Sequence, residues 1–181
     1  MSKALHLTSA PQRLLANQCL GSVLAVIGSA TTAITTTGTP ALAFDGILTP
    51  AAAQTNLALS ALAASSLSSN QAGWVQPSGL DAAFYVQPAS TTVYYVVGVV
   101  GGSTWKVVQG TYDGQALPFS GVGRSVIPDV PDGFVPVAVI KVVTSGATFT
   151  VGTTSLGTGG QTSGGVATIK NVSVLPAAGT F

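Results

Sequence analysis

Two side chains in the N-terminal region have the chemistry for nucleophilic catalysis: His6, the only histidine, and Cys19, the only cysteine. A nucleophile that an imidazole activates must share a cleft with it, within hydrogen-bond reach. His6 stands five residues from the N-terminus, where we expect a solvated side chain. Cys19 stands in an apolar stretch, where a thiol usually behaves as a small buried hydrophobe. A single cysteine also excludes an internal disulfide framework and a cysteine-based zinc site.

Two aspartates, Asp113 and Asp132, have the residue type of the paired carboxylates in a glycosidase. Each precedes a glycine in a turn context, where an Asp side chain commonly caps nearby backbone. The pairs Gly101-Gly102 and Gly159-Gly160 lack the following helix that a phosphate-binding loop requires. We therefore predict turns at these positions, and no catalytic, metal or cofactor site in the chain.

Aromatic side chains offer another chemistry, which is stacking against sugar rings. Aromatic residues that alternate along strands are more often part of a core or of a subunit interface. We favour that interpretation and keep a sugar-binding platform as the alternative. The residues concerned are Trp74, Tyr85, Tyr94, Tyr95, Trp105 and Tyr112.

The composition excludes several classes of protein. Only 6% of the 181 residues are charged, with six Lys or Arg and five Asp, against about 25% in a typical domain. Six scattered cations cannot supply the basic stripe that nucleic-acid binding requires. No stretch of about 20 predominantly apolar residues predicts a membrane-spanning helix. The apolar content of 46% also argues against intrinsic disorder.

The scarcity of charge has a second implication. The net charge is +1 and the mean hydropathy is +0.54, whereas a soluble monomer normally covers its surface with charged side chains. We therefore expect other protein chains to cover part of this surface, as in a component of an assembly.

Residues 1–30 are predicted to form an N-terminal arm with a short helix. Ser9 suits the N-cap and Pro11 the first turn, and Gly21 would end or weaken the helix. The apolar face of this arm either covers the protein's own β core or reaches a neighbouring subunit. The candidate interface residues are Leu14, Leu15, Leu20, Val23 and Ile27.

The same segment imitates a secretory signal peptide, because Lys3 and Arg13 precede the apolar stretch 19–27 and small residues follow it. Gly21 and Ser22 interrupt that stretch. We therefore favour a docking arm over a signal peptide for residues 1–30.

Residues 31–181 are predicted to form one β domain. Asp45-Gly46 stands between short apolar runs and predicts a hairpin. Further strands are expected at 91–100, 104–109, 134–143, 147–151 and 166–174, with a turn at 112–114. Pro136 places the start of its strand at a sheet edge or where the strand joins the sheet. Seven or more short strands predict an all-β fold, an antiparallel, jelly-roll-like sandwich or barrel.

Three segments together resemble a family of small bacteriophage proteins, the head decoration or capsid cement proteins. The first is FDGI at 44–47 with AAAQTNLAL at 51–59, and the second is YYVVGV at 94–99 with WKVVQG at 105–110. The third and most specific is PDVPDGFVPVAVIKV at 128–142, followed by FTVGTTSL at 149–156. The resemblance covers roughly residues 31–175 and leaves out the arm. Related chains often carry a polar or aromatic residue in place of Leu48.

The resemblance implies an antiparallel β domain, often trimeric, on the outer face of an icosahedral shell. We accordingly expect a non-enzymatic virion structural protein that stabilises the capsid exterior, made in the host cytoplasm before assembly. Its expected partners are the major capsid protein and itself, as a homotrimer, with no nucleic-acid or membrane partner. The alternatives are a fibre or adhesin domain that binds host glycans, and a tail or connector component.

Overall fold

The computed structural model describes eleven β-strands and no helix in the part of the chain that it covers. All strand pairs there are antiparallel, which confirms the all-β prediction. The described residues are 18–20, 24–27, 32–39, 41–44, 47–58, 86–100, 103–115, 122–128, 130, 133–156, 161–162 and 165–172.

The largest sheet has five strands in the order β10-β11-β9-β7-β8. Its two long strands, β7 and β9, are rich in Val, Ile and Tyr, which suit a pleated surface covered on both sides. The hairpin of β7 and β8 confirms the predicted return of the chain after residue 102. The strand bounds are β7 Thr92–Val100, β8 Thr104–Gln109, β9 Phe134–Val143, β10 Gln161–Thr162 and β11 Gly165–Asn171.

Pro136 lies where β9 joins this sheet. The register between β9 and β11 ends at Ala138, and one further bond joins the Val172 N–H to the Val137 carbonyl, so a proline at 136 removes none of the hydrogen bonds between these strands. On the other side, Val97 pairs with Ala138 but Gly98 pairs with Pro136, which makes Val137 the extra residue of a β-bulge. The strand is central in the sheet, and only its first residues are open toward β11.

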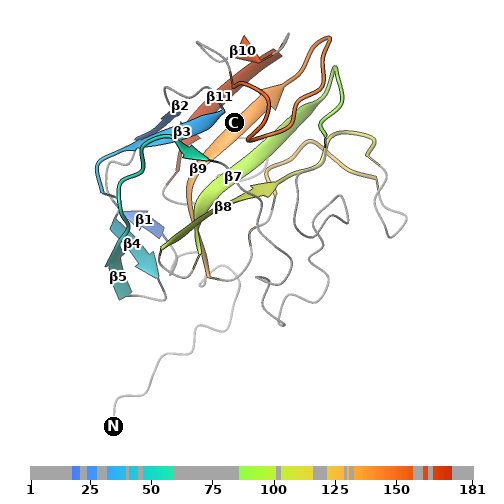
Figure 1. The fold of residues 1–181 in the computed structure, drawn as a ribbon. Coiled ribbons are helices and arrows are strands. Elements are labelled where there is room, and N and C mark those ends of the chain that lie inside the picture. The colour runs from blue at the N-terminus through green and yellow to red at the C-terminus, as the bar shows by residue number, and fades with distance from the viewer. Residues whose placement is uncertain are drawn as a thin grey trace.

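Two smaller sheets complete the described structure, in the orders β1-β4-β5 and β2-β3-β6. The predicted Asp-Gly hairpin is confirmed, because Phe44 pairs with Ile47 across a two-residue connection. Figure 1 shows β1, β4 and β5 grouped at one end of the large sheet, and β2 and β3 near β11. The bounds are β1 Gln18–Leu20, β2 Leu24–Ile27, β3 Ala33–Thr37, β4 Ala41–Phe44, β5 Ile47–Pro50 and β6 Leu57–Ala58.

The core joins all three sheets on one face of the large sheet. Cys19, Leu42 and Ile34 from the small sheets pack in one cluster with Tyr95 and Ile140 of β7 and β9. A second cluster lies on the opposite face of the large sheet. It consists of Val96, Val108, Phe134 and Val139, with Ile127 and Val130 packed against it. Both faces of the large sheet are therefore covered, as its apolar sequences require.

Two expectations differ from the structure. Residues 18–20 and 24–27, expected within a helical arm, are strands that pair with β4 and β3. Glycine and serine at 21 and 22 interrupt a helix, and tertiary pairing then decides the conformation of the flanking residues. The strand expected at 147–151 is only an isolated bridge between Phe149 and Gln87, followed by a turn over 151–154. Residues 1–17 lie outside the described part of the chain.

Candidate protein interface

The β1-β4-β5 sheet has two faces of different exposure. Cross-strand partners share a face and successive residues alternate. Cys19 pairs with Leu42, and these two side chains are 3% and 0% exposed in the core. The alternate positions therefore point away from the core. They include Leu20, Ala43 and Leu48, and we call this side of the sheet the outer face.

The outer face is mostly apolar and carries no charged residue; its one polar side chain in these three strands is Gln18, the cross-strand partner of Ala43. Leu20 is 42% exposed and Leu48 is 64% exposed. Ala41 and Ala43 lie between them on β4 and are half-buried, and Pro50 at the end of β5 is exposed. Strands β1, β4 and β5 contain no Lys, Arg, Asp or Glu at all. Water thus meets a row of apolar side chains that the fold has not buried.

The β5 strand forms an edge of this sheet, with β4 on one side and no described strand on the other. In a two-residue hairpin the residues that flank the turn, here Phe44 and Ile47, form a hydrogen-bonded pair. Along an antiparallel pair, hydrogen-bonded and non-hydrogen-bonded residue pairs alternate. Leu48 and Ala43 therefore form a non-hydrogen-bonded pair, and the backbone N–H and C=O of Leu48 point away from β4. The backbone of Pro50, two residues along, also points away from β4, so its missing N–H removes no bond to that strand. Figure 1 shows β5 at the outer margin of the small sheet.

The edge lacks the charged residues that commonly prevent pairing with another chain. Natural edge strands are often guarded by a lysine or another charge. Here the first residue, Ile47, is 70% exposed, and Leu48 follows it. Only Pro50, at the far end, limits the length of the edge. The combination of apolar face and open edge makes this sheet the candidate interface.

The structure does not place the predicted interface residues on one surface. Leu20 lies on the outer face, although on a strand rather than on a helix. Ile27 belongs to β2 and pairs with Ile34. Leu14, Leu15 and Val23 lie outside the described residues. Ile47 and Leu48 were not assigned to an interface from the sequence, although an uncharged Ile-Leu pair directly after a hairpin turn was a usable signal.

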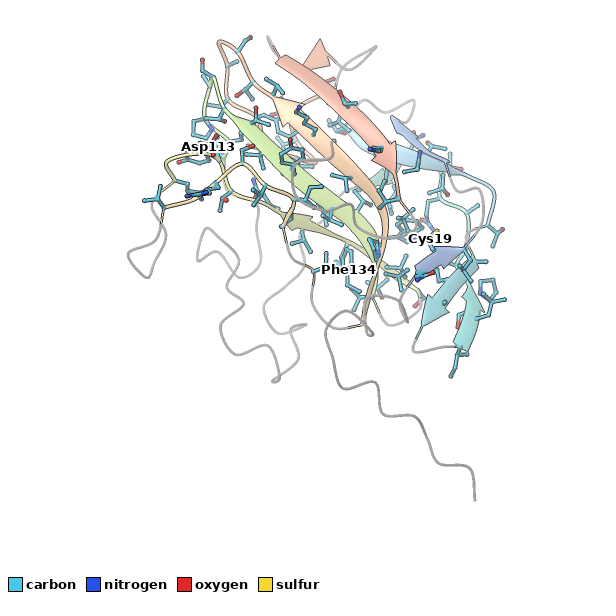
Figure 2. All side chains as sticks on the ribbon, turned by 180° about the vertical axis from the view of Figure 1, so that it is seen from behind. Cys19, Asp113 and Phe134 are labelled. Atoms are coloured by element: carbon cyan, nitrogen blue, oxygen red, sulfur yellow. The ribbon has the colours of Figure 1, made fainter. Side chains whose placement is uncertain are left out.

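Of the candidate catalytic residues, the structure describes Cys19 and Asp113, and these two do not lie together. Cys19 is buried, and its burial raises the pKa of the thiol, so the thiolate is disfavoured. Figure 2 places Cys19 and Asp113 at opposite ends of the molecule. His6 and Asp132 lie outside the described residues. Among the residues that the structure covers, no group of three or more His, Cys, Asp or Glu could hold a metal ion.

Asp113 has a structural task in the turn that the sequence predicted. Gly114 adopts a φ of +83°, which glycine tolerates without strain. The Oδ1 atom of Asp113 accepts a 2.8 Å hydrogen bond from the backbone N–H of Ser125. The carboxylate therefore joins this turn to the segment 122–126, rather than capping the residues directly after it.

The described aromatic residues do not form one stacking platform. Tyr95 and Trp105 are 0% and 8% exposed and belong to the core cluster of the small sheets. Tyr112 packs against that same cluster. Tyr94 packs on the opposite face of the large sheet, where the Nζ atom of Lys141 lies 5.9 Å from its ring centroid. Trp74 and Tyr85 lie outside the described residues.

A buried polar cluster holds residues 86–91 against the large sheet. The Gln87 side chain donates to the carbonyls of Thr91 and Val142, both at 3.1 Å. Its Oε1 atom accepts a 3.0 Å bond from the hydroxyl of Tyr95, which itself accepts from Gln109 at 3.3 Å. These groups bond one another and the backbone, so we assign the cluster to stability rather than to ligand binding.

Comparison of the chain with protein-family models, with curated proteins and with solved structures finds no match. Within the described residues, no helix is long and apolar enough to cross a membrane.

Proposed function

We propose that this chain is a non-enzymatic virion structural protein that binds the exterior of a bacteriophage capsid and stabilises it. The observation that carries the proposal is the uncharged outer face of the β1-β4-β5 sheet, with Leu20 and Leu48 exposed to solvent. The resemblance of residues 31–175 to head decoration proteins supplies the kind of assembly. The proposed partners are the major capsid protein and further copies of the chain, as a homotrimer on the outer surface of the shell.

The physical argument begins with the unburied apolar surface. Each Å² of apolar area removed from water contributes about 25 cal/mol. A flat sheet face with no charge to desolvate can therefore bind another protein without the penalty that a buried unpaired charge carries. An outer face of three short strands is small, so one copy contributes modestly. Many copies across the seams between coat subunits would add their contributions over the whole shell.

The amino-acid composition also supports a role in an assembly. Only 6% of the residues are charged, and low charge favours association between protein surfaces. The buried side chains of Gln87, Tyr95 and Gln109 are also committed to internal hydrogen bonds. Binding through an apolar face is thus the function that the geometry supports best.

The experiment is binding of the purified full chain to empty shells that are assembled from the coat protein alone. We expect saturable binding and a higher temperature of shell disruption in calorimetry. The Leu20→Asp variant should lose most of the binding, because it places a charge on the outer face. Val122→Asp is the matched control, since Val122 is 69% exposed but lies outside the small sheet.

Equal binding by the chain and by Leu20→Asp would refute the assignment of the outer face. Absence of binding to intact shells would refute the capsid proposal itself and would direct the search to tail or fibre components.

A further inference from the structure

We infer that the open edge of β5 pairs with β5 of a second copy of this chain, antiparallel and about a two-fold axis at Leu48. This inference concerns the chain alone and goes beyond the proposed function, because it does not depend on which protein meets the outer face. It rests on three properties of the edge: its hydrogen-bonding phase, its lack of charge and the pattern of its side chains.

The hydrogen-bonding phase suits pairing with an identical strand. The N–H and C=O of Leu48 both point outward, as the register with β4 requires. In an antiparallel hydrogen-bonded pair, two residues exchange both bonds. When Leu48 faces Leu48 of the second copy, each N–H therefore donates to the other C=O. The missing N–H of Pro50 lies away from this central pair.

The absence of charge favours a second copy over a charged partner strand. A two-fold axis brings each residue close to its own equivalent, so a charged edge would place like charges opposite one another, which is destabilising. Strands β1, β4 and β5 contain no charged residue. A partner strand rich in Lys, Arg, Asp or Glu would have no group of opposite sign to meet on this sheet.

The side chains form a continuous apolar surface in this register. Leu48 of each copy lies on the outer face, directly opposite its equivalent, at the distance where cross-strand pairs interact. Ile47, which is 70% exposed in the single chain, is opposite Thr49 of the second copy on the other face. The two three-stranded sheets become one six-stranded sheet, and the two outer faces merge into one.

The strength of the contact follows from its size. A stable dimer usually buries about 800 Å² per partner, and an edge of four residues supplies less than that. The pairing should therefore be weak in dilute solution and should strengthen where copies are held side by side, as on a shell, by effective concentration. A two-fold contact of this kind would link neighbouring oligomers, while a trimer would use other surfaces.

The test introduces opposite charges at Leu48, on the two-fold axis, in two variants of the full chain. Self-association of each variant is measured in the absence of coat-protein shells. We expect the natural chain to associate reversibly in sedimentation velocity between micromolar and millimolar concentrations. Leu48→Lys and Leu48→Glu should each shift this equilibrium toward the smaller species, because like charges then meet at the axis. An equimolar mixture of these two variants should associate again, since opposite charges now face each other.

The controls separate pairing from misfolding. Leu48 is 64% exposed, so both variants should keep the thermal unfolding transition of the natural chain. Val122→Lys adds the same charge away from the edge and should leave the association unchanged. A natural chain whose association state does not change between micromolar and millimolar concentration would overturn the inference. So would Leu48 variants that associate like the natural chain, or a mixture that does not recover association. None of these outcomes depends on binding to a coat protein.

Discussion

Gly98 is the position where a single added methyl group should cost most. It lies on β7 beside the bulge, opposite Pro136 of β9. A Cβ atom at Gly98 would overlap the carbonyl oxygen of Val135 and the Cε1 atom of Phe134, and it would lie 2.7 Å from the Cζ atom of that ring. The ring is 2% exposed, so it has little space in which to move.

The size of the effect follows from these contacts. Overpacking a core costs about 1–3 kcal/mol and occasionally more. The Val135 oxygen belongs to the backbone of β9 and cannot move without disturbing its pairing with β7. Alanine regains roughly 0.5–1 kcal/mol over glycine inside a strand. Because a backbone atom is the obstacle, the upper end of the overpacking cost, about 3 kcal/mol, applies. After the regain, we expect Gly98→Ala to destabilise the fold by about 2–2.5 kcal/mol, which for a chain of this size lowers the melting temperature by roughly 4–10 °C.

The assay is thermal and denaturant unfolding of Gly98→Ala beside Gly146→Ala. A Cβ atom at Gly146 would meet no other atom within 4 Å, and the φ of this residue is not positive. Its substitution should therefore change stability by under about 1 kcal/mol. A double-mutant cycle with Phe134→Leu adds a second test. The leucine removes the ring atoms that clash, so it should cost at least about 1 kcal/mol less beside Gly98→Ala than in the natural chain.

Two results would refute this reasoning. The first is a Gly98→Ala variant as stable as Gly146→Ala, which would show that the strand pair yields easily. The second is strict additivity with Phe134→Leu, which would show that the ring is not the obstacle.

Three further predictions concern the core. Tyr95→Phe removes a buried hydroxyl that bonds Gln87 and Gln109 and should cost about 1–3 kcal/mol in denaturant unfolding; no change would show that the cluster is dispensable. Thr144→Val removes the hydroxyl that accepts from Thr91 N–H and donates to a carbonyl and should cost a similar amount by the same measurement. Burial raises the pKa of the Cys19 thiol in the folded protein. The buried neutral thiol therefore contributes fully to stability below the unfolded pKa of about 8.5. This contribution is lost as pH rises through the folded pKa, because the thiol then ionises in the core. Cys19→Ala should therefore flatten the fall in unfolding free energy measured as pH rises above about 8.5.

Local chemistry made the central strands and turns predictable. Residues 91–100 and 134–143 are so rich in β-branched side chains that the strand conformation follows from their own sterics. Asp45-Gly46 and Asp113-Gly114 combine residues that favour turns, and the hairpin of β4 and β5 and the turn at 113–114 appear where they were expected. The position of Pro136 also followed from one fact, its missing N–H.

Sequence reasoning failed where the conformation depends on a distant partner. Residues 18–20 could have continued a helix, but Cys19 lies opposite Leu42 and β1 packs against β9. Phe149 has a strand-like sequence around it, yet its backbone forms only an isolated bridge with Gln87. In both places the pairing joins segments far apart along the chain, and no local pattern records it.

The sequence by itself determined that this chain is an all-β protein with too little charge to cover its own surface, because composition and alternation are local properties. Only the tertiary structure decided where the uncovered apolar surface lies. The register of β1, β4 and β5 turns Cys19 and Leu42 into the core and leaves Leu20 and Leu48 outside. A shift of one residue would exchange these two sets, since side chains alternate along a strand. That choice is made by packing against β9, which the sequence of the small sheet alone does not contain.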